Sequence, residues 1–340
     1  MYNWLHRMWY KGAPSYRLLV PLSGIYWLLI TLRRFLYHIG LFGRQKAVVP
    51  VIVVGNITTG GTGKTPVTIW LVKALSARGF TPGIVSRGYG GSRSKTSMRV
   101  DAASDPAIVG DEPVLLARRT QCPVVVDANR ARAAQMLADD GVDVIVADDG
   151  LQHYRLERTY EICVIDGARG LGNRLLLPAG PLRETIGRLE EVDQVLINGQ
   201  MHEEGPDITA GEQNAIEINL VASEVERLNG SLARSIERFS GTTVHGVAAI
   251  GNPERFFDML RMHGIQVIEH AFQDHAAISQ SDLKFGDDFD VLMTEKDAVK
   301  LGHVRSDKYW VVPVDMQIDA AAAGPWLEQI ESRLRSEMES

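Results

Sequence analysis

The sequence predicts an α/β fold: a mostly parallel sheet with helices on both faces, followed by a smaller α/β domain. The first observation is a β-branched run at 51–54, typical of a strand that is buried on both faces. The second is the apolar, helix-like segment 67–75 that follows it. The third is the return of buried-strand patterns at 123–126 and 142–147. Strands that alternate with helices in this way form parallel sheets, because each helix returns the chain across the sheet.

A glycine-rich turn, GGTGKT at 60–65, joins the first strand to the first helix. Glycines let backbone N–H groups point at phosphate oxygens, Lys64 can reach the β- and γ-phosphates, and the Thr65 hydroxyl can bind Mg²⁺. The pattern G-x-x-x-x-G-K-[ST] is missed at one position, where Thr58 replaces the first glycine, and the alternative is a chance glycine-rich turn. Because strand, turn and helix follow in the required order, we favour a P-loop. The predicted nucleotide-binding residues are Thr58, Thr59, Gly60, Gly61, Thr62, Gly63, Lys64 and Thr65.

A second signal is VDVIVADDG at 142–150, an apolar strand that ends in two aspartates. In nucleotide-binding sheets a carboxylate at this place holds Mg²⁺ directly or through water, so Asp148 is the expected metal partner together with Thr65. A turn-forming DDG after an ordinary strand is the alternative. Because a P-loop lies upstream, we interpret the stretch as a Walker B strand and expect ATP and Mg²⁺ as cofactors.

Two further loops carry candidate groups. In SRGYG at 86–90, Arg87 can clamp an anion and Tyr89 stands beside it, although a solvated loop is the alternative. GDEP at 110–113 places Asp111 at a helix start, where a carboxylate can simply be a favourable partner of the helix dipole. In a kinase, a carboxylate near the γ-phosphate accepts the proton of the attacking hydroxyl, and Asp111 is the candidate for that role.

The composition is that of an ordinary globular protein, with 340 residues of which 45% are hydrophobic and 23% charged. That length suffices for two domains with their own cores. Cys122 and Cys163 lie far apart and in no C-x-x-C or Cys/His cluster. This pattern argues against a disulfide framework or a zinc site and fits a reducing cytosol.

The charges are distributed unevenly along the chain. Residues 1–100 contain 14 Lys and Arg and no acidic residue, whereas residues 101–340 contain 22 basic and 42 acidic residues. A cationic first part suggests an anionic partner, either a membrane surface or a nucleic acid.

Residues 1–43 favour the membrane, because Trp and Tyr are interspersed there with Arg and Lys as in an interfacial belt. The uncharged run 18–32 is 15 residues long and contains Pro21 and Gly24, which makes it short for a spanning helix. We therefore expect an amphipathic helical segment at 1–45, peripheral or shallowly inserted in the cytoplasmic leaflet. The alternative is a helical hairpin that packs on the protein's own core.

These stretches together resemble one family. The matching segments are VGNITTGGTGKTP at 54–66, SRGYG, GDEP, DDGLQH at 148–153, LLLPAGPLRE at 175–184 and TEKDAVK at 294–300. They occur in the order found in the tetraacyldisaccharide 4'-kinases, the lipid A 4'-kinases of Gram-negative bacteria. The resemblance covers about residues 1–300, and the combination of DDGLQH, LPAGPLRE and the glycine-rich loop is its most specific part.

The resemblance implies ATP-dependent phosphorylation of the 4'-hydroxyl of an acylated glucosamine disaccharide 1-phosphate lipid. The product would be lipid IVA, at the cytoplasmic face of the bacterial inner membrane. It further implies that Lys64 and Asp148 act in catalysis and that Asp111 is the base, assisted by His275. Many members have two adjacent histidines where this chain has His275-Ala276. Candidates for metal, acceptor or phosphate contacts are Arg87, Tyr89, Asp149, His153, Arg183 and Glu184.

We expect three parts: the membrane-interface segment 1–45, a P-loop kinase core at 46–213, and a smaller α/β domain at 214–340 that completes a cleft. Two rival functions remain. A membrane-associated P-loop switch ATPase of the partitioning type requires a lysine where this chain has Thr59. A nucleic-acid-binding protein would use the basic first hundred residues, and we do not expect this partner. The sequence leaves the acyl-chain preference and the oligomeric state open.

Overall fold

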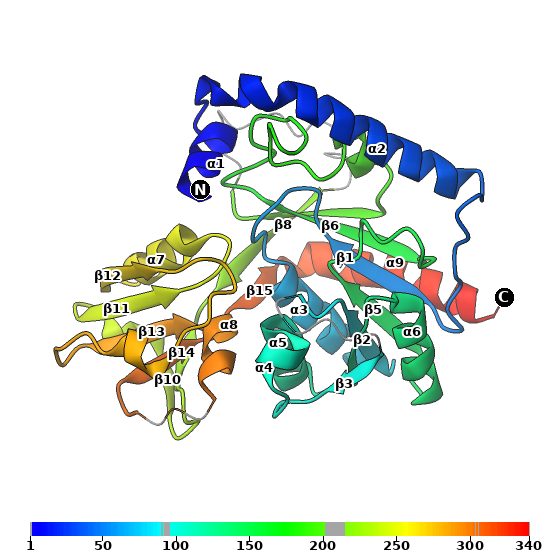
Figure 1. The fold of residues 1–340 in the computed structure, drawn as a ribbon. Helices are drawn as coiled ribbons and strands as arrows, with labels where there is room; N and C mark the ends of the chain where they lie inside the picture. Colours follow the sequence, from blue (N-terminus) through cyan, green and yellow to red (C-terminus); the bar gives the residue numbers. More distant parts are fainter. Residues whose placement is uncertain are drawn as a thin grey trace.

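The computed structural model describes residues 2–89, 91, 96–200, 215–302, 304 and 306–339, and it contains two sheets that lie side by side (Figure 1). The first sheet has the order β15 (Asp315–Ile318), β8 (Ala215–Val221), β7 (Gln194–Asn198), β6 (Tyr160–Asp166), β1 (Val51–Gly55), β5 (Val144–Asp148), β2 (Pro82–Ser86), β4 (Val124–Val126) and β3 (Met98–Val100). The second sheet has the order β10 (Ala233–Ser235), β9 (Glu224–Arg227), β14 (Tyr309–Val312), β13 (Asp290–Thr294), β11 (Thr243–Ala248) and β12 (Gln266–Ala271).

The helices connect and cover these strands. They are α1 (Tyr2–Tyr10), α2 (Val20–His38), α3 (Lys64–Ala77), α4 (Pro106–Val109), α5 (Asp111–Thr120), α6 (Arg130–Asp139), α7 (Pro253–Met262), α8 (Glu295–Ala298) and α9 (Ala320–Met338). Short 3₁₀ helices occur at η1 (Pro14–Leu19), η2 (Ile186–Glu190), η4 (Ile236–Phe239), η5 (Gln280–Leu283) and η6 (Val299–Leu301). The pairs from β8 through β7, β6, β1, β5 and β2 to β4 are parallel, whereas β15 and β3 are antiparallel edge strands.

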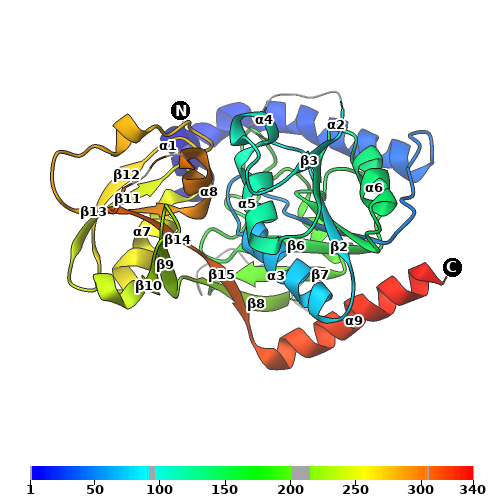
Figure 2. The same cartoon turned by 90° about the horizontal axis from the view of Figure 1, so that it is seen from below.

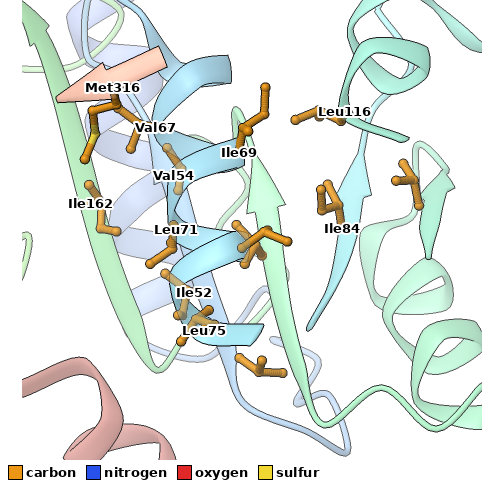
Figure 3. Packing of buried hydrophobic residues seen from close by; sticks show 14 of the residues in the cluster. Ile52, Val54, Val67, Ile69, Leu71, Leu75, Ile84, Leu116, Ile162 and Met316 are labelled. Atoms are coloured by element: carbon orange, nitrogen blue, oxygen red, sulfur yellow. The ribbon is translucent and has the colours of Figure 1, made fainter. Parts of the chain in front are cut away.

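The β-branched run of β1 is explained by burial on both of its faces. Ile52 and Val54 pack in a core with side chains of α3 and α5 (Figure 3), to which α9 also contributes. Val51 and Val53 pack on the opposite face with α6. Residues two apart in a strand share a face, so the run supplies apolar side chains to both cores. The predicted mostly parallel sheet with helices on both faces is therefore confirmed.

The N-terminal helices lie along one side of the molecule, with α2 extended over the loops that follow β6 (Figure 1). The helical stretch Pro14–His38 is long enough and apolar enough to cross a membrane, with a mean hydropathy of 1.3. It is nevertheless bound to the body along its length: Tyr26 donates to the carbonyl of Arg183, Arg33 donates to the carbonyl of Gln152, and Arg34 pairs with Glu191. The side chains of α2 that do not contact the body are apolar and exposed. They include Leu22, Ile25, Leu28, Leu29, Leu32 and Phe35.

The boundary expected at residue 214 does not coincide with the division between the two sheets. Strand β8 pairs with β7, and the chain returns at β15 to pair with β8 before α9 packs on the first core. Figure 2 shows this return, with α9 running beneath the first sheet. The second sheet is therefore an insertion of about residues 222–314 between two strands of the first. Residues 201–214, where the expected boundary falls, lie outside the described residues.

Candidate active site

A cavity of about 740 Å³ lies between the two sheets. One wall consists of the P-loop, the start of α3 and the segments that follow β2, β5 and β7. The other wall consists of α7, the segment after β12 and the start of α8. Ligands of open α/β sheets bind outside the carboxyl ends of the strands, so the cavity has the position expected of a binding site.

The conformation of the P-loop depends on two glycines and on hydrogen bonds to its flanks. Gly60 and Gly63 both have a φ of +97°, a conformation that side chains rarely adopt. Asn198 at the end of β7 donates from Nδ2 to the carbonyl of Thr62 at 3.0 Å, and the amide of Thr59 donates to the carbonyl of Pro181 at 2.9 Å. The loop is thus fixed on both sides, and α3 begins at Lys64 with its N-terminus at the cavity.

Lys64 meets the two aspartates at the end of β5, Asp148 and Asp149, at the floor of the cavity. Lys64 Nζ lies 3.4 Å from Oδ1 of Asp149, and Arg183 Nη1 lies 3.3 Å from Oδ2 of the same carboxylate. Although burial alone raises the pKa of Asp149, the charges of Lys64, Arg183 and Arg130 outweigh it and hold that pKa below its ordinary value. Asp149 therefore stays ionised and neutralises part of the positive charge that faces the cavity.

Asp148 is in the opposite electrostatic state. Its side chain is buried, and its Oδ1 finds no hydrogen-bond partner among the described residues. Burial, followed by the charges of Glu112 and Asp149, raises the pKa of Asp148 to about 7. A buried carboxylate oxygen without a partner is costly unless a cation or donor joins it. This oxygen and the hydroxyl of Thr65, which also lines the cavity, are hard donors of the kind that Mg²⁺ prefers.

The second sheet brings His275 to Asp111, which begins α5. Nδ1 of His275 lies 3.0 Å from Oδ1 and 3.1 Å from Oδ2 of Asp111. His275 has a φ of +60°, unusual for a residue other than glycine, and its amide donates to the carbonyl of Ala249 at 3.2 Å. His275 and Glu112 line the cavity, whereas Asp111 is 4% exposed and lies outside the lining.

The pKa values of this pair are shifted in opposite directions. Burial alone raises the pKa of Asp111, but the hydrogen bond with His275 and the charges of Lys296 and Lys300 hold it below its ordinary value. Burial alone lowers the pKa of His275, but the same hydrogen bond raises that pKa above its ordinary value, and the charge of Lys296 works against this rise. Asp111 is therefore a carboxylate at neutral pH, which a proton acceptor must be.

Two lysines of the segment TEKDAVK lie beside this pair. Lys296 Nζ lies 3.2 Å from Nε2 of His275 and 3.0 Å from Oε1 of Glu112. Lys300 Nζ lies 3.6 Å from Oδ2 of Asp111 and donates to Asp297 at 2.9 Å. The sequence shows two lysines after a strand, but their acidic partners Glu112 and Asp111 belong to a distant segment and could not be inferred from it.

The second-rank candidates divide into two groups. Arg87, Tyr89, Asp149 and Arg183 line the cavity, and the ring of Tyr89 lies 4.9 Å from that of His275. Two others do not line it: His153 and Glu184. Burial and the charges of nearby arginines lower the pKa of His153 to about 3, so its ring is neutral.

Glu184 is buried away from the cavity. It accepts a hydrogen bond from the hydroxyl of Tyr154 and lies 3.5 Å from Nε of Arg188. Its surroundings are those of a structural ion-pair network rather than of a substrate contact.

The structure also identifies Arg169, which the sequence did not single out. Its guanidinium donates to the carbonyls of Gly61 in the P-loop and Gly251 before α7, and its Nε donates to Asp166 at 3.0 Å. It also lies 5.6 Å from the ring centre of Tyr10 in α1. One arginine therefore contacts the N-terminal helices, the P-loop and the second sheet. The sequence signal that could have identified Arg169 is its position three residues after Asp166, which ends β6.

Comparison with known proteins identifies the relatives of this chain. A family model described as tetraacyldisaccharide-1-P 4'-kinase (LpxK) matches residues 15–332. The chain belongs to this family. The tetraacyldisaccharide 4'-kinase of Nitrosococcus oceani is 44% identical over 333 residues, which cover 98% of this chain and 96% of that protein. The tetraacyldisaccharide 4'-kinase of Alkalilimnicola ehrlichii is 48% identical over 319 residues, which cover 93% and 94%.

A solved structure agrees with these relatives. The crystal structure of LpxK from Aquifex aeolicus in complex with ATP superposes with a TM-score of 0.76 at 25% identity, covering 94% of this chain and 99% of that one. The resemblance drawn from the motifs is therefore confirmed, and with it the class of enzyme, a kinase that phosphorylates a hydroxyl group. The apolar N-terminal helix fits an association with a membrane.

Proposed function

We propose that the protein transfers the γ-phosphoryl group of ATP to the 4'-hydroxyl of a tetraacylated glucosamine disaccharide 1-phosphate. The product is lipid IVA, formed at the cytoplasmic face of the bacterial inner membrane. One observation carries the proposal: a single cavity is lined both by the P-loop with Lys64 and by His275, which is hydrogen-bonded to Asp111. The names of the curated relatives and the ATP complex of the Aquifex aeolicus protein support the same substrates.

The proposed roles follow from the charges around the cavity. The backbone N–H groups of the P-loop and the ammonium of Lys64 bind the β- and γ-phosphates. The acceptor hydroxyl loses its proton to the Asp111 carboxylate as its oxygen forms a bond to the γ-phosphorus, while the bond to the β–γ bridging oxygen breaks and ADP leaves. Contacts of this kind commonly tighten only when both substrates are bound, and Asp111 lies just outside the cavity wall.

A magnesium ion fits the same floor. Asp148 and Thr65 would hold it, because the buried Oδ1 of Asp148 lacks a partner among the described residues. Bound there, Mg²⁺ would neutralise charge on the phosphates. In the described part of the chain, no cluster of three or more His, Cys, Asp or Glu side chains is arranged to hold a metal. This suits Mg²⁺, which usually combines one or two carboxylates with water and phosphate oxygens.

The proposed membrane contact uses the exposed side of α2. Leu29 is 59% exposed and Leu32 is 50% exposed, so the apolar side chains on this face have no cover within the described structure. The inner side of the same helix is bound to the loop that carries Arg183. A helix with this arrangement lies in the interfacial plane, where it holds the cavity close to the lipid headgroups while the acyl chains of the acceptor stay in the bilayer.

The test is a lipid phosphorylation assay. Purified protein is incubated with γ-³²P-ATP, Mg²⁺ and disaccharide 1-phosphate in detergent micelles, and the lipids are then separated. Lys64→Ala and Asp111→Asn should each lower kcat by at least about 10². Lys308→Met removes an exposed lysine of the second sheet and serves as the control.

Each result has a defined meaning. Labelled lipid from the wild-type protein and from the control, but not from the two variants, supports the proposal. Release of phosphate without labelled lipid would instead indicate an ATPase, and normal turnover by Asp111→Asn would remove Asp111 from the role of base.

A further inference from the structure

A second group lies on the far side of His275 from Asp111. Nδ1 of the ring lies 3.0 Å from Asp111, and Nε2 lies 3.2 Å from Nζ of Lys296. The side chain of Lys296 is 14% exposed and is also held by Glu112 at 3.0 Å and by Asp274 at 3.3 Å. The ring is therefore fixed between a carboxylate and an ammonium group.

The chemistry of these partners leaves one arrangement of protons. An ammonium group has only donors, so a ring nitrogen that meets it must accept with its lone pair. Nε2 is then unprotonated, and the single ring proton is on Nδ1, from which it is donated to Asp111. An imidazolium ring would place an N–H group against the ammonium at 3.2 Å, where neither could accept.

We propose that Lys296 is a positioning residue that works against protonation of Nε2 of His275 and so favours the ring form with its single proton on Nδ1. This inference rests on the proposed function, in which Asp111 is the base. In this arrangement His275 cannot take up the acceptor's proton at Nδ1, because that nitrogen already carries one. His275 therefore orients the Asp111 carboxylate, and the proton from the acceptor remains on Asp111 until the products leave.

Other charged groups act on the ring and set the direction of the pH effect. Asp274 lies 3.8 Å from Nε2, Lys300 lies 3.6 Å from Asp111, and the ring of Tyr89 lies 4.9 Å from the His275 ring at an interplanar angle of 59°. Burial lowers the pKa of Lys296, but the charges of Glu112, Asp111 and Asp274 outweigh it and hold that pKa above its ordinary value, so the lysine stays charged. When the lysine is removed, Asp274 and Glu112 remain without their cation and favour the imidazolium form.

The first experiment is the pH profile of kcat for the full-length protein in micelles. Lys296→Met should move the acid limb of the profile to higher pH by about one unit or more, because a cation beside Nε2 is lost. Lys296→Arg keeps a charged group with donors only and should restore the wild-type limb. An unshifted limb in Lys296→Met would overturn the proposal. A loss confined to KM for ATP would do the same, because it would make Lys296 a phosphate ligand.

The second experiment detects the tautomer directly. ¹⁵N-histidine-labelled protein is examined by NMR, and the His275 signals are assigned with His275→Gln. The wild type should show a protonated Nδ1 and an unprotonated Nε2, and Lys296→Met should lose this pattern. Lys300→Met is the matched control, since Lys300 is similarly buried at 11% exposure but contacts Asp111 rather than Nε2, and it should keep the pattern.

The two measurements separate the inference from the function on which it rests. If Asp111→Asn were active while the tautomer followed Lys296, the base assignment would fail and the role of Lys296 would stand. If Asp111→Asn were inactive and the tautomer did not respond to Lys296→Met, only the inference would fail.

Discussion

Replacing Asp148 with Asn should stabilise the nucleotide-free protein while it abolishes phosphoryl transfer. The carboxyl is 2% exposed, and burial raises its pKa to about 7 from an ordinary 3.8. Because the folded-state pKa lies above that of the unfolded chain, ionisation lowers stability progressively as the pH rises from about 4 to about 7, and the full loss persists above pH 7. At 1.36 kcal/mol per pKa unit, the loss is on the order of 4 kcal/mol as an upper bound.

Asn is isosteric and carries no charge, so it removes this loss. Allowing for water that enters an open cavity, we expect a gain of about 2 kcal/mol at pH 8, or about 3 °C in Tm for a chain of this size. The assay is thermal unfolding followed by circular dichroism, with EDTA and no nucleotide, at pH 5 and pH 8. The difference in Tm between Asp148→Asn and the wild type should be larger at pH 8.

The neighbouring carboxylate supplies a matched control with the opposite sign. The pKa of Asp149 is held below its ordinary value, so its ionised form contributes stability above the unfolded-state pKa, and Asp149→Asn should lower the Tm at pH 8. The left-handed backbone at Asp149, with a φ of +49°, also tolerates Asn. A lower Tm for Asp148→Asn at pH 8, or the same difference at both pH values, would refute this reasoning.

Two further predictions concern the membrane face and the P-loop. Leu29→Glu on α2 should weaken binding to phosphatidylglycerol vesicles by about tenfold without changing the Tm in detergent. Leu232→Glu, on an exposed turn of the second sheet, should bind the vesicles as the wild type does. Equal sedimentation of both variants with the vesicles would contradict the proposed contact between α2 and the membrane. Gly63→Ala should abolish binding of a non-hydrolysable ATP analogue in calorimetry, because its Cβ would lie 2.5 Å from Nδ2 of Asn198, whereas Gly79→Ala, with a similar φ but nothing within 4 Å, should bind it. Retained binding by Gly63→Ala would show that the loop can adapt.

The sequence predicted those parts of the site that are encoded by local patterns. Lys64 and Asp148 follow buried strands with recognisable turn residues, so their place at the carboxyl edge of the sheet could be inferred from the sequence alone. His275 could be chosen only through the family resemblance, since nothing in its own segment distinguishes it from other histidines. Its distance of 3.0 Å from Asp111 agrees with that choice.

The remaining features depend on pairing between distant segments. Strand β15 pairs with β8 although about ninety residues separate them in the chain. No local sequence pattern predicts this pairing, so the boundary expected at 214 did not include the return of the chain to the first sheet. Glu184 was a reasonable acceptor contact from its motif, but its side chain turns to Tyr154 and Arg188. The segment after that motif forms only the 3₁₀ helix η2, Ile186–Glu190. Its Arg188 is buried in ion pairs with Glu161 and Glu184.

The hydrogen bond from Tyr26 to the carbonyl of Arg183 has a kinetic consequence. It joins α2 to the residue whose guanidinium pairs with Asp149 beside Lys64. If α2 rests on the lipid as proposed, the depth of α2 in the interface also sets the distance of the phosphate-binding residues from the bilayer. An enzyme tethered in this way meets its acceptor by diffusion in two dimensions. Its rate then follows the mole fraction of acceptor in the leaflet, and dilution of the whole suspension leaves that rate unchanged.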